Sequence, residues 1–95
     1  MIGFEEQKKI LALIGSSCKR RVEAVIIGGS AMLFYNFTKT ATKDIDIVVF
    51  SEADRRYLID VLKGLGFSEK SRGKGNEPVR MEFKEFILDV FCQNV

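Results

Sequence analysis

Histidine is absent from this chain of 95 residues, and its absence removes several classes of enzyme at once. Without an imidazole there is no Ser-His or Cys-His nucleophile pair, no histidine general base and no histidine-bound zinc. Two cysteines, Cys18 and Cys92, lie far apart without a Cys-x-x-Cys spacing, so they define neither a zinc site nor a disulfide framework. Any catalysis must therefore use carboxylates, lysines, hydroxyls or a metal ion held by oxygen ligands.

Long hydrophobic runs and a strong net charge are also lacking. No segment approaches the roughly 20 apolar residues that cross a bilayer, and the acidic start of the chain does not resemble a signal peptide. The net charge of +2 is too small to indicate wrapping by nucleic acid. We expect a cytoplasmic protein with reduced cysteines and no membrane attachment. The basic residues form two clusters. A solvated surface is the first interpretation of both, and phosphate binding is the second. The first cluster is Lys8, Lys9, Lys19, Arg20 and Arg21, and the second is Lys70, Arg72 and Lys74.

The hydrophobic pattern predicts one domain over residues 1–95 with the order α-β-α-β-α-β-β. Helices are expected over 4–19, from Ser30 onward, and from Ser51 to the glycines at 64 and 66. Strands are expected over 22–27, which we expect to be buried on both faces, and over 44–50, 67–69, 79–83 and 86–92, with a loop over 71–78. This order predicts an α/β (α+β) fold with a mixed sheet flanked by helices.

Asp44 and Asp46 begin one of the predicted strands. Alternate residues of a strand face the same side, so both carboxylates point one way while Ile45 and Ile47 enter the core. Such carboxylates suit hard divalent cations such as Mg²⁺. A solvated strand end explains the pair equally well.

Asp89 is the single charge in the predicted strand over 86–92. A lone carboxylate is costly to bury unless it meets a cation or several hydrogen bonds. For Asp89 taken alone, the first interpretation is an exposed sheet face or a salt bridge to a lysine or arginine.

Gly28, Gly29 and Ser30 lie between a predicted strand and a predicted helix. Glycines let a phosphate approach the free amides at a helix N-terminus, and Ser30 can cap the helix or donate to a phosphate oxygen. A simple strand-to-helix turn is the alternative, because the Gly-Lys-Ser/Thr ending of a Walker loop is missing.

The combination of a phosphate-binding turn with three strand carboxylates predicts two-metal phosphoryl-type transfer. The stretch from Val25 to Phe50 contains Ile-Gly-Gly-Ser-Ala and, thirteen residues after Ser30, Asp-Ile-Asp-Ile. It resembles the signature of the DNA polymerase β-like nucleotidyltransferase superfamily, and Asp89 falls where the third acid of that family is expected. The wording of the motif is similar to small prokaryotic nucleotidyltransferases, including those of abortive-infection and toxin–antitoxin systems.

This resemblance implies a Mg²⁺- or Mn²⁺-dependent enzyme that moves a nucleoside monophosphate from an NTP, such as ATP, to a hydroxyl and releases pyrophosphate. Asp44, Asp46 and Asp89 would be both the catalytic and the metal-binding residues. The residues implied to bind the nucleotide phosphates are Gly28, Gly29, Ser30 and Lys43.

The acceptor implied by the resemblance is tRNA or another RNA, a protein or a small molecule. Members of the family usually continue beyond the third acid. We therefore expect one of two things: the chain is a shortened remnant, or its site is completed by another protein. That other protein would be a second copy of this chain, in a homodimer, or a cognate partner protein. Two alternatives stay open. One is a non-catalytic nucleotide-binding or partner-binding module that retains the fold. The other is a nucleic-acid-binding adaptor, which would explain neither the acids nor the glycines.

Overall fold

A mixed sheet organises the chain, for which a computed structural model describes residues 2–27, 41–42, 44–74 and 77–93. Five strands form the sheet in the order β2-β4-β7-β6-β5, and β4 and β7 are its parallel pair. Two shorter strands, β1 and β3, pair with each other. This arrangement confirms the predicted mixed α+β fold. The elements are β1 (Ile2–Gly3), α1 (Phe4–Ser17), β2 (Ala24–Ile27), β3 (Ala41–Thr42), β4 (Ile45–Val49), α3 (Glu52–Gly64), β5 (Ser68–Arg72), β6 (Val79–Phe83) and β7 (Phe86–Cys92).

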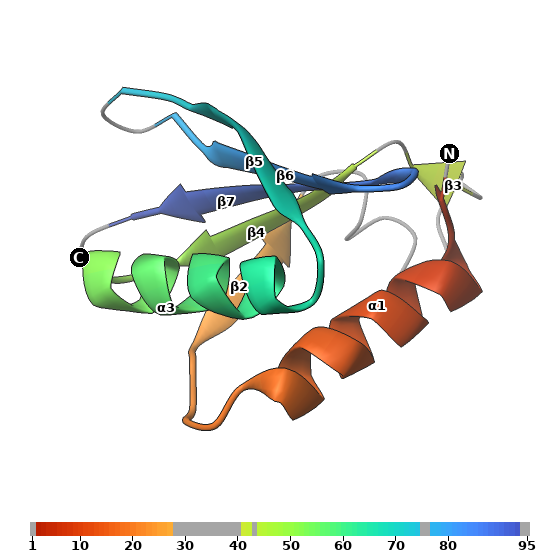
Figure 1. The fold of residues 1–95 in the computed structure, drawn as a ribbon, viewed down its shortest axis with the longest axis horizontal. Helices are drawn as coiled ribbons and strands as arrows, with labels where there is room; N and C mark the ends of the chain where they lie inside the picture. The colour runs from red at the N-terminus through yellow and green to blue at the C-terminus, as the bar shows by residue number, and fades with distance from the viewer. Residues whose placement is uncertain (1, 28–40, 43, 75–76, 94–95) are drawn as a thin grey trace.

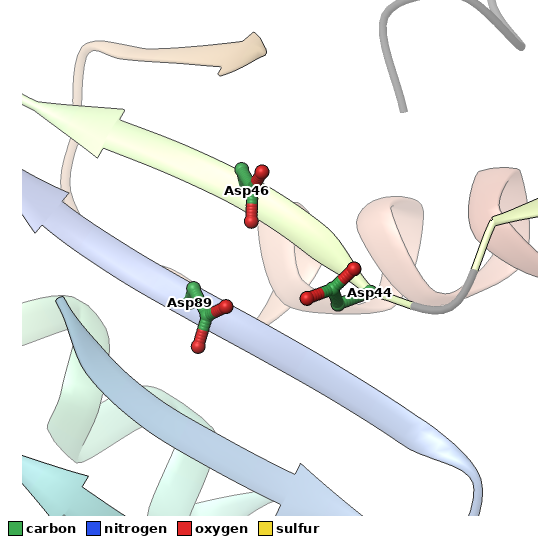
Figure 2. Close-up of side chains that lie close together, drawn as sticks. All are labelled: Asp44, Asp46 and Asp89. Atoms are coloured by element: carbon green, nitrogen blue, oxygen red, sulfur yellow. The ribbon is translucent and has the colours of Figure 1, made fainter. Parts of the chain in front are cut away.

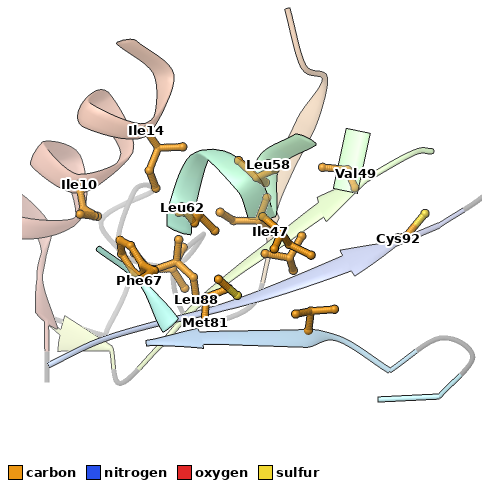
Figure 3. Packing of buried hydrophobic residues seen from close by; sticks show 14 residues of the cluster. Ile10, Ile14, Ile47, Val49, Leu58, Leu62, Phe67, Met81, Leu88 and Cys92 are labelled. Carbon is orange, nitrogen blue, oxygen red and sulfur yellow. The ribbon is translucent and has the colours of Figure 1, made fainter. Parts of the chain in front are cut away.

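Both described helices lie on the same side of the sheet (Figure 1). Alternate residues of the strands point toward them, because successive side chains of a strand face opposite sides. The core between helices and sheet is closed by fully buried side chains such as Leu62, Met81 and Leu88 (Figure 3). The face turned away from the helices is therefore where the other half of the strand side chains must lie.

Helix α3 begins and ends where the sequence predicts. Ser51 is its N-cap, and the Ser51 hydroxyl accepts a hydrogen bond from the amide of Asp54 at 3.1 Å. After the last helical residue, Gly64, the chain turns at Gly66, whose φ of 105° lies in the left-handed region that favours glycine. The buried side chains of α3 are Leu58, Ile59 and Leu62.

Contacts from the first basic cluster join the end of α1 to α3. The backbone amide of Lys19 donates to the Tyr57 hydroxyl at 2.6 Å, and the Arg20 guanidinium lies 4.4 Å from the centre of the Tyr57 ring. Arg20 also pairs with Asp54 at 2.8 Å.

Neither α1 nor α3 has the length and apolar character that a membrane crossing requires.

The two edge strands of the sheet differ from the predictions. The expectation that residues 22–27 are buried on both faces is wrong, because β2 lies at the edge and leaves Val25 47% and Ile27 38% exposed. The other edge strand, β5, extends to Arg72, into the predicted loop over 71–78. A polar edge strand with most of its side chains in water has no hydrophobic alternation that would reveal it. The helix predicted from Ser30 lies outside the described residues.

Helix α1 contains a buried side-chain amide without a hydrogen-bond partner among the described residues. Gln7 is 0% exposed, and neither its side-chain nitrogen nor its side-chain oxygen has a hydrogen-bond partner within the part of the chain that the structure describes. An amide removed from water without replacement hydrogen bonds lowers the free energy of unfolding.

Replacing Gln7 by the similarly shaped Met is therefore expected to stabilise the protein. The Gln7→Met substitution should raise the free energy of unfolding by about 1 kcal/mol, since it removes the desolvated amide and keeps the volume. Urea denaturation followed by circular dichroism measures the change. Gln93→Met, at an exposed position after β7, is the control and should leave stability nearly unchanged. A loss of stability in Gln7→Met would show that the amide has a stabilising role.

Candidate functional site

Three carboxylates meet at the centre of the sheet. The parallel register of β4 and β7 pairs Asp46 with Asp89, and Asp44 immediately precedes β4. Their side chains lie together on the two neighbouring strands (Figure 2), and one carboxylate oxygen from each lies within 4.8 Å of the others. The structure thus brings together the three acids that the sequence singles out.

Strand alternation explains why these acids share a face of the sheet. Ile45 and Ile47 in β4, and Leu88 and Val90 in β7, are buried in the core under the helices. Asp89 lies between two of these core residues, so its side chain leaves the sheet on the side away from α1 and α3. Just upstream of β4, the β1–β3 pair holds the chain at Ala41 and Thr42.

An arginine on a third strand faces the acids. Arg80 in β6 is opposite Asp89 in the antiparallel register. Its Nε donates to Asp89 Oδ1 at 2.8 Å and its Nη2 donates to Asp89 Oδ2 at 2.9 Å. The same Nη2 lies 3.5 Å from Asp44 Oδ2. The salt bridge that was one interpretation of Asp89 is therefore present, and it extends to a second acid of the cluster.

The exposure of the two partners is unequal. The side chain of Asp89 is 7% exposed, whereas that of Arg80 is 41% exposed. The pKa of Arg80 is raised above its ordinary value, first by its hydrogen bonds to Asp89 and then by the charges of Asp89 and Asp44. The guanidinium therefore stays protonated and supplies a permanent positive charge to a largely buried carboxylate.

Arg80 is the site residue that sequence reasoning missed, although a signal for it exists. Val79 and Met81 are core positions, so alternation puts Arg80 on the opposite face of β6. The β6–β7 hairpin has a two-residue turn, with Phe83 paired to Phe86, and counting back from that turn places Arg80 across from Asp89. Predicting the contact between Arg80 and Asp89 requires two pieces of information together: the face of β6 on which Arg80 lies and the register of the β6–β7 hairpin.

A hollow of about 300 Å³ adjoins the Arg80–Asp89 pair. Its other walls come from the end of β5 and from the segment before β6: Ser71, Arg72, Gly73, Glu77 and Pro78. The second basic cluster contributes Arg72, but that guanidinium binds Glu69, with Nη2 to Oε1 at 2.8 Å. The hollow is thus a space of mixed charge beside the acids.

The residues predicted to bind phosphate, Gly28, Gly29, Ser30 and Lys43, lie outside the described residues, and their role stays a prediction. The strand that leads to them is described, and its last residue, Ile27, pairs with Asp46. The chain therefore leaves β2 toward the glycines at a point next to the acids.

The donor set at the acids fits a hard divalent cation. All the ligand atoms that the cluster offers are carboxylate oxygens from Asp44, Asp46 and Asp89, which is the chemistry that Mg²⁺ and Mn²⁺ prefer. The arrangement already includes one cation, since Arg80 contacts Asp89 and Asp44.

Comparisons with known proteins agree with this architecture. Residues 5–86 match the model of a family described as nucleotidyltransferases of unknown function (DUF6036). Two solved structures of the antibiotic-resistance factor ANT(2'')-Ia are similar in fold. One is a crystal structure with adenylyl-2''-tobramycin, with a TM-score of 0.75 and 20% identity over 90% of this chain. The other is a solution structure, with a TM-score of 0.73 and 19% identity over 90% of this chain.

The aligned region is only part of ANT(2'')-Ia. This chain spans about half the length of those two structures, covering 49% and 46% of them. A search of the curated proteins gives no significant match. The family match confirms the predicted nucleotidyltransferase family, and the two solved structures confirm the predicted fold.

The Arg80–Asp89 pair is expected to stabilise the metal-free protein. A double-mutant cycle with Arg80→Gln and Asp89→Asn should give a coupling free energy of about 1–2 kcal/mol in EDTA, because the bond is bidentate and one partner is buried. Urea denaturation of the four proteins measures it. The control cycle, Arg21→Gln with Glu23→Gln, breaks a pair at 3.7 Å whose side chains are 87% and 71% exposed, and its coupling should be smaller because solvent screens it. Equal couplings would contradict the importance of burial.

Proposed function

The chain belongs to the DUF6036 family of nucleotidyltransferases of unknown function, and from this membership we propose that it transfers a nucleoside monophosphate from an NTP to a hydroxyl acceptor, with release of pyrophosphate. The proposal depends on one observation. The β4–β7 register and the position of Asp44 gather three carboxylates, with an oxygen from each within 4.8 Å of the others. A cluster of hard oxygen ligands on a nucleotidyltransferase fold is the arrangement that divalent-ion catalysis requires.

The proposed reaction exchanges one phosphorus–oxygen bond for another. The acceptor oxygen forms a bond to the α-phosphorus, the bond from the α-phosphorus to the bridging oxygen breaks, and pyrophosphate leaves with that electron pair. The acceptor hydroxyl loses its proton. Divalent ions, when bound, neutralise the negative charge on the triphosphate and lower the pKa of the acceptor hydroxyl.

The residues of the chain have separate tasks in this proposal. Asp44 and Asp46 would hold the divalent ions beside the triphosphate, and Asp89 would hold an ion on the acceptor side and help to remove the proton. Gly28, Gly29, Ser30 and Lys43 would bind the β- and γ-phosphates. Support for that location comes from Ile27, which pairs with Asp46 directly before the glycines.

The acceptor is proposed only as a hydroxyl-bearing molecule. The ANT(2'')-Ia crystal structure contains adenylyl-2''-tobramycin, so in that protein the nucleotide is found joined to a small molecule. For this chain, a small molecule, tRNA or another RNA, and a protein all remain acceptors to test. A second copy or a cognate partner protein, as in toxin–antitoxin systems, remains a proposal for what completes the acceptor side.

One observation favours a second candidate, a non-catalytic module that keeps the fold. Arg80 already provides a cation to Asp89 and Asp44, with contacts of 2.8 Å and 3.5 Å. A domain that had lost metal binding could retain its acids through such a pair. Metal-dependent nucleotide binding followed by transfer separates the two functions.

Magnesium and NTP together are expected to raise the melting temperature. At ten times the dissociation constant, bound ligand adds about 1.4 kcal/mol, which corresponds to roughly 6–11 °C for a domain of this size. Asp46→Asn should abolish the rise because it removes a ligand of the divalent ion. Differential scanning fluorimetry with each of the four NTPs, with Mg²⁺ or EDTA, measures the effect.

Asp60→Asn is the matched control, since Asp60 is an exposed acid on α3. That variant should keep the full rise in melting temperature. Transfer is then measured with α-³²P-labelled NTPs, Mg²⁺ and candidate acceptors, by label incorporation and pyrophosphate release. Binding without transfer to any acceptor would support the module, and a rise that persists in Asp46→Asn would remove the acids from the proposed function.

A further inference from the structure

We propose that Arg80 is a built-in cation that holds the acidic cluster closed, so that a divalent ion binds only when the guanidinium releases Asp89 and Asp44. This inference rests on the proposed function, because it concerns the same three acids. It assigns Arg80 the part of a positioning residue that sets the metal affinity of the site, and it predicts that the metal and the triphosphate favour each other's binding.

The first step in the argument is where the guanidinium lies. Its Nη2 approaches Asp89 Oδ2 at 2.9 Å and Asp44 Oδ2 at 3.5 Å, so a single nitrogen lies between two of the three acids. A cation that joins the same two carboxylates would need that space. Arg80 is therefore a competitor for the position, rather than a residue that only orients Asp89 from behind.

The second step is that both oxygens of Asp89 are already bonded. Nε donates to one and Nη2 to the other, in the parallel two-bond geometry that makes Arg–carboxylate pairs strong. A divalent ion that approaches Asp89 Oδ2 from the side of Asp44 meets Nη2 there and has to replace its bond. Its affinity is then lowered by the free energy needed to open the pair.

The third step identifies which partner moves. The side chain of Asp89 is 7% exposed and belongs to a central strand, whereas that of Arg80 is 41% exposed. Arg80 also lines the hollow of about 300 Å³ beside β5, which gives the long side chain space to turn into. A released guanidinium can reach water there, but a released Asp89 carboxylate would stay buried and pay for desolvation.

Charge gives the fourth step. Arg80 brings one positive charge to a cluster of three carboxylates, whereas a divalent ion brings two. A triphosphate brought with the ion adds negative charge, and the displaced guanidinium then has an anion to bind. The metal and the triphosphate should therefore bind with positive coupling, since each removes part of what the other must overcome.

The test compares metal affinity with metal-free stability in the same variants. Isothermal titration with MnCl₂ in the absence of nucleotide is performed on wild type, Arg80→Gln and Arg80→Lys, and melting temperatures are measured in EDTA. If the pair closes the site in about nine molecules of ten, Arg80→Gln should bind Mn²⁺ about tenfold more tightly than wild type. The same variant should melt at a lower temperature in EDTA, because Asp89 stays buried without its cation.

If Arg80 competes with the metal, Arg80→Gln raises the Mn²⁺ affinity while it lowers the melting temperature. A purely structural role of Arg80 would lower both metal affinity and stability. Arg80→Lys keeps the charge but not the two-bond geometry, and it should show a smaller gain in Mn²⁺ affinity. If Arg80→Gln does not fold, the gain in Arg80→Lys decides the matter. Arg55→Gln, which loses the same charge on the helix side of the sheet, is the control and should bind Mn²⁺ as wild type does.

The outcomes also separate this inference from the proposed function. If wild type binds Mn²⁺ and the folded Arg80 variants bind it no more tightly, the inference alone is overturned. Wild type and Arg80→Gln that both fail to bind Mn²⁺, with and without NTP, overturn the proposed function and the inference together.

Discussion

The parallel pairing of β4 with β7 is the contact from which the site is built. Its register places Asp46 beside Asp89 on one face and Ile47 beside Val90 in the core on the other. The neighbouring strands then extend the same row, with Ile27 of β2 opposite Asp46 and Arg80 of β6 opposite Asp89. A slip of one residue in β7 would turn its acid into the core and a core residue out of it. The hydrophobic packing that holds the sheet together thus also fixes the position of the carboxylates.

The electrostatics of this row explain how the fold tolerates like charges at its centre. Two acids on neighbouring strands repel each other, and burial of Asp89 raises the cost further. Arg80 offsets both effects without a bound ion, because it contacts Asp89 with two bonds and approaches Asp44 with one of the same nitrogens. The cation that stabilises the free protein therefore contacts two of the three carboxylates that we propose as ligands of a divalent ion.

Much of the fold followed from the sequence because its central elements are strongly patterned. The alternation in β6 and β7 gave both strands with their observed bounds, and Ser51 marked the start of α3. The predictions for the two edge strands of the sheet failed for physical reasons. β2 is apolar but exposed, and β5 is polar because most of its side chains lie in water. Residue type and spacing singled out the three acids that the structure brings together, whereas Arg80 was missed because its partner depends on a register that residue type alone does not reveal.

The row of charged residues also has a consequence for the order in which the protein folds. Arg80 and Asp89 are nine residues apart in one hairpin, whereas Asp46 meets Asp89 only when a long crossover brings β7 alongside β4. Short loops close at a lower entropic cost than long ones, so hairpin contacts form ahead of distant parallel ones. Asp89 would then already carry its counter-ion when Asp46 arrives beside it, which lowers the repulsion between the two carboxylates.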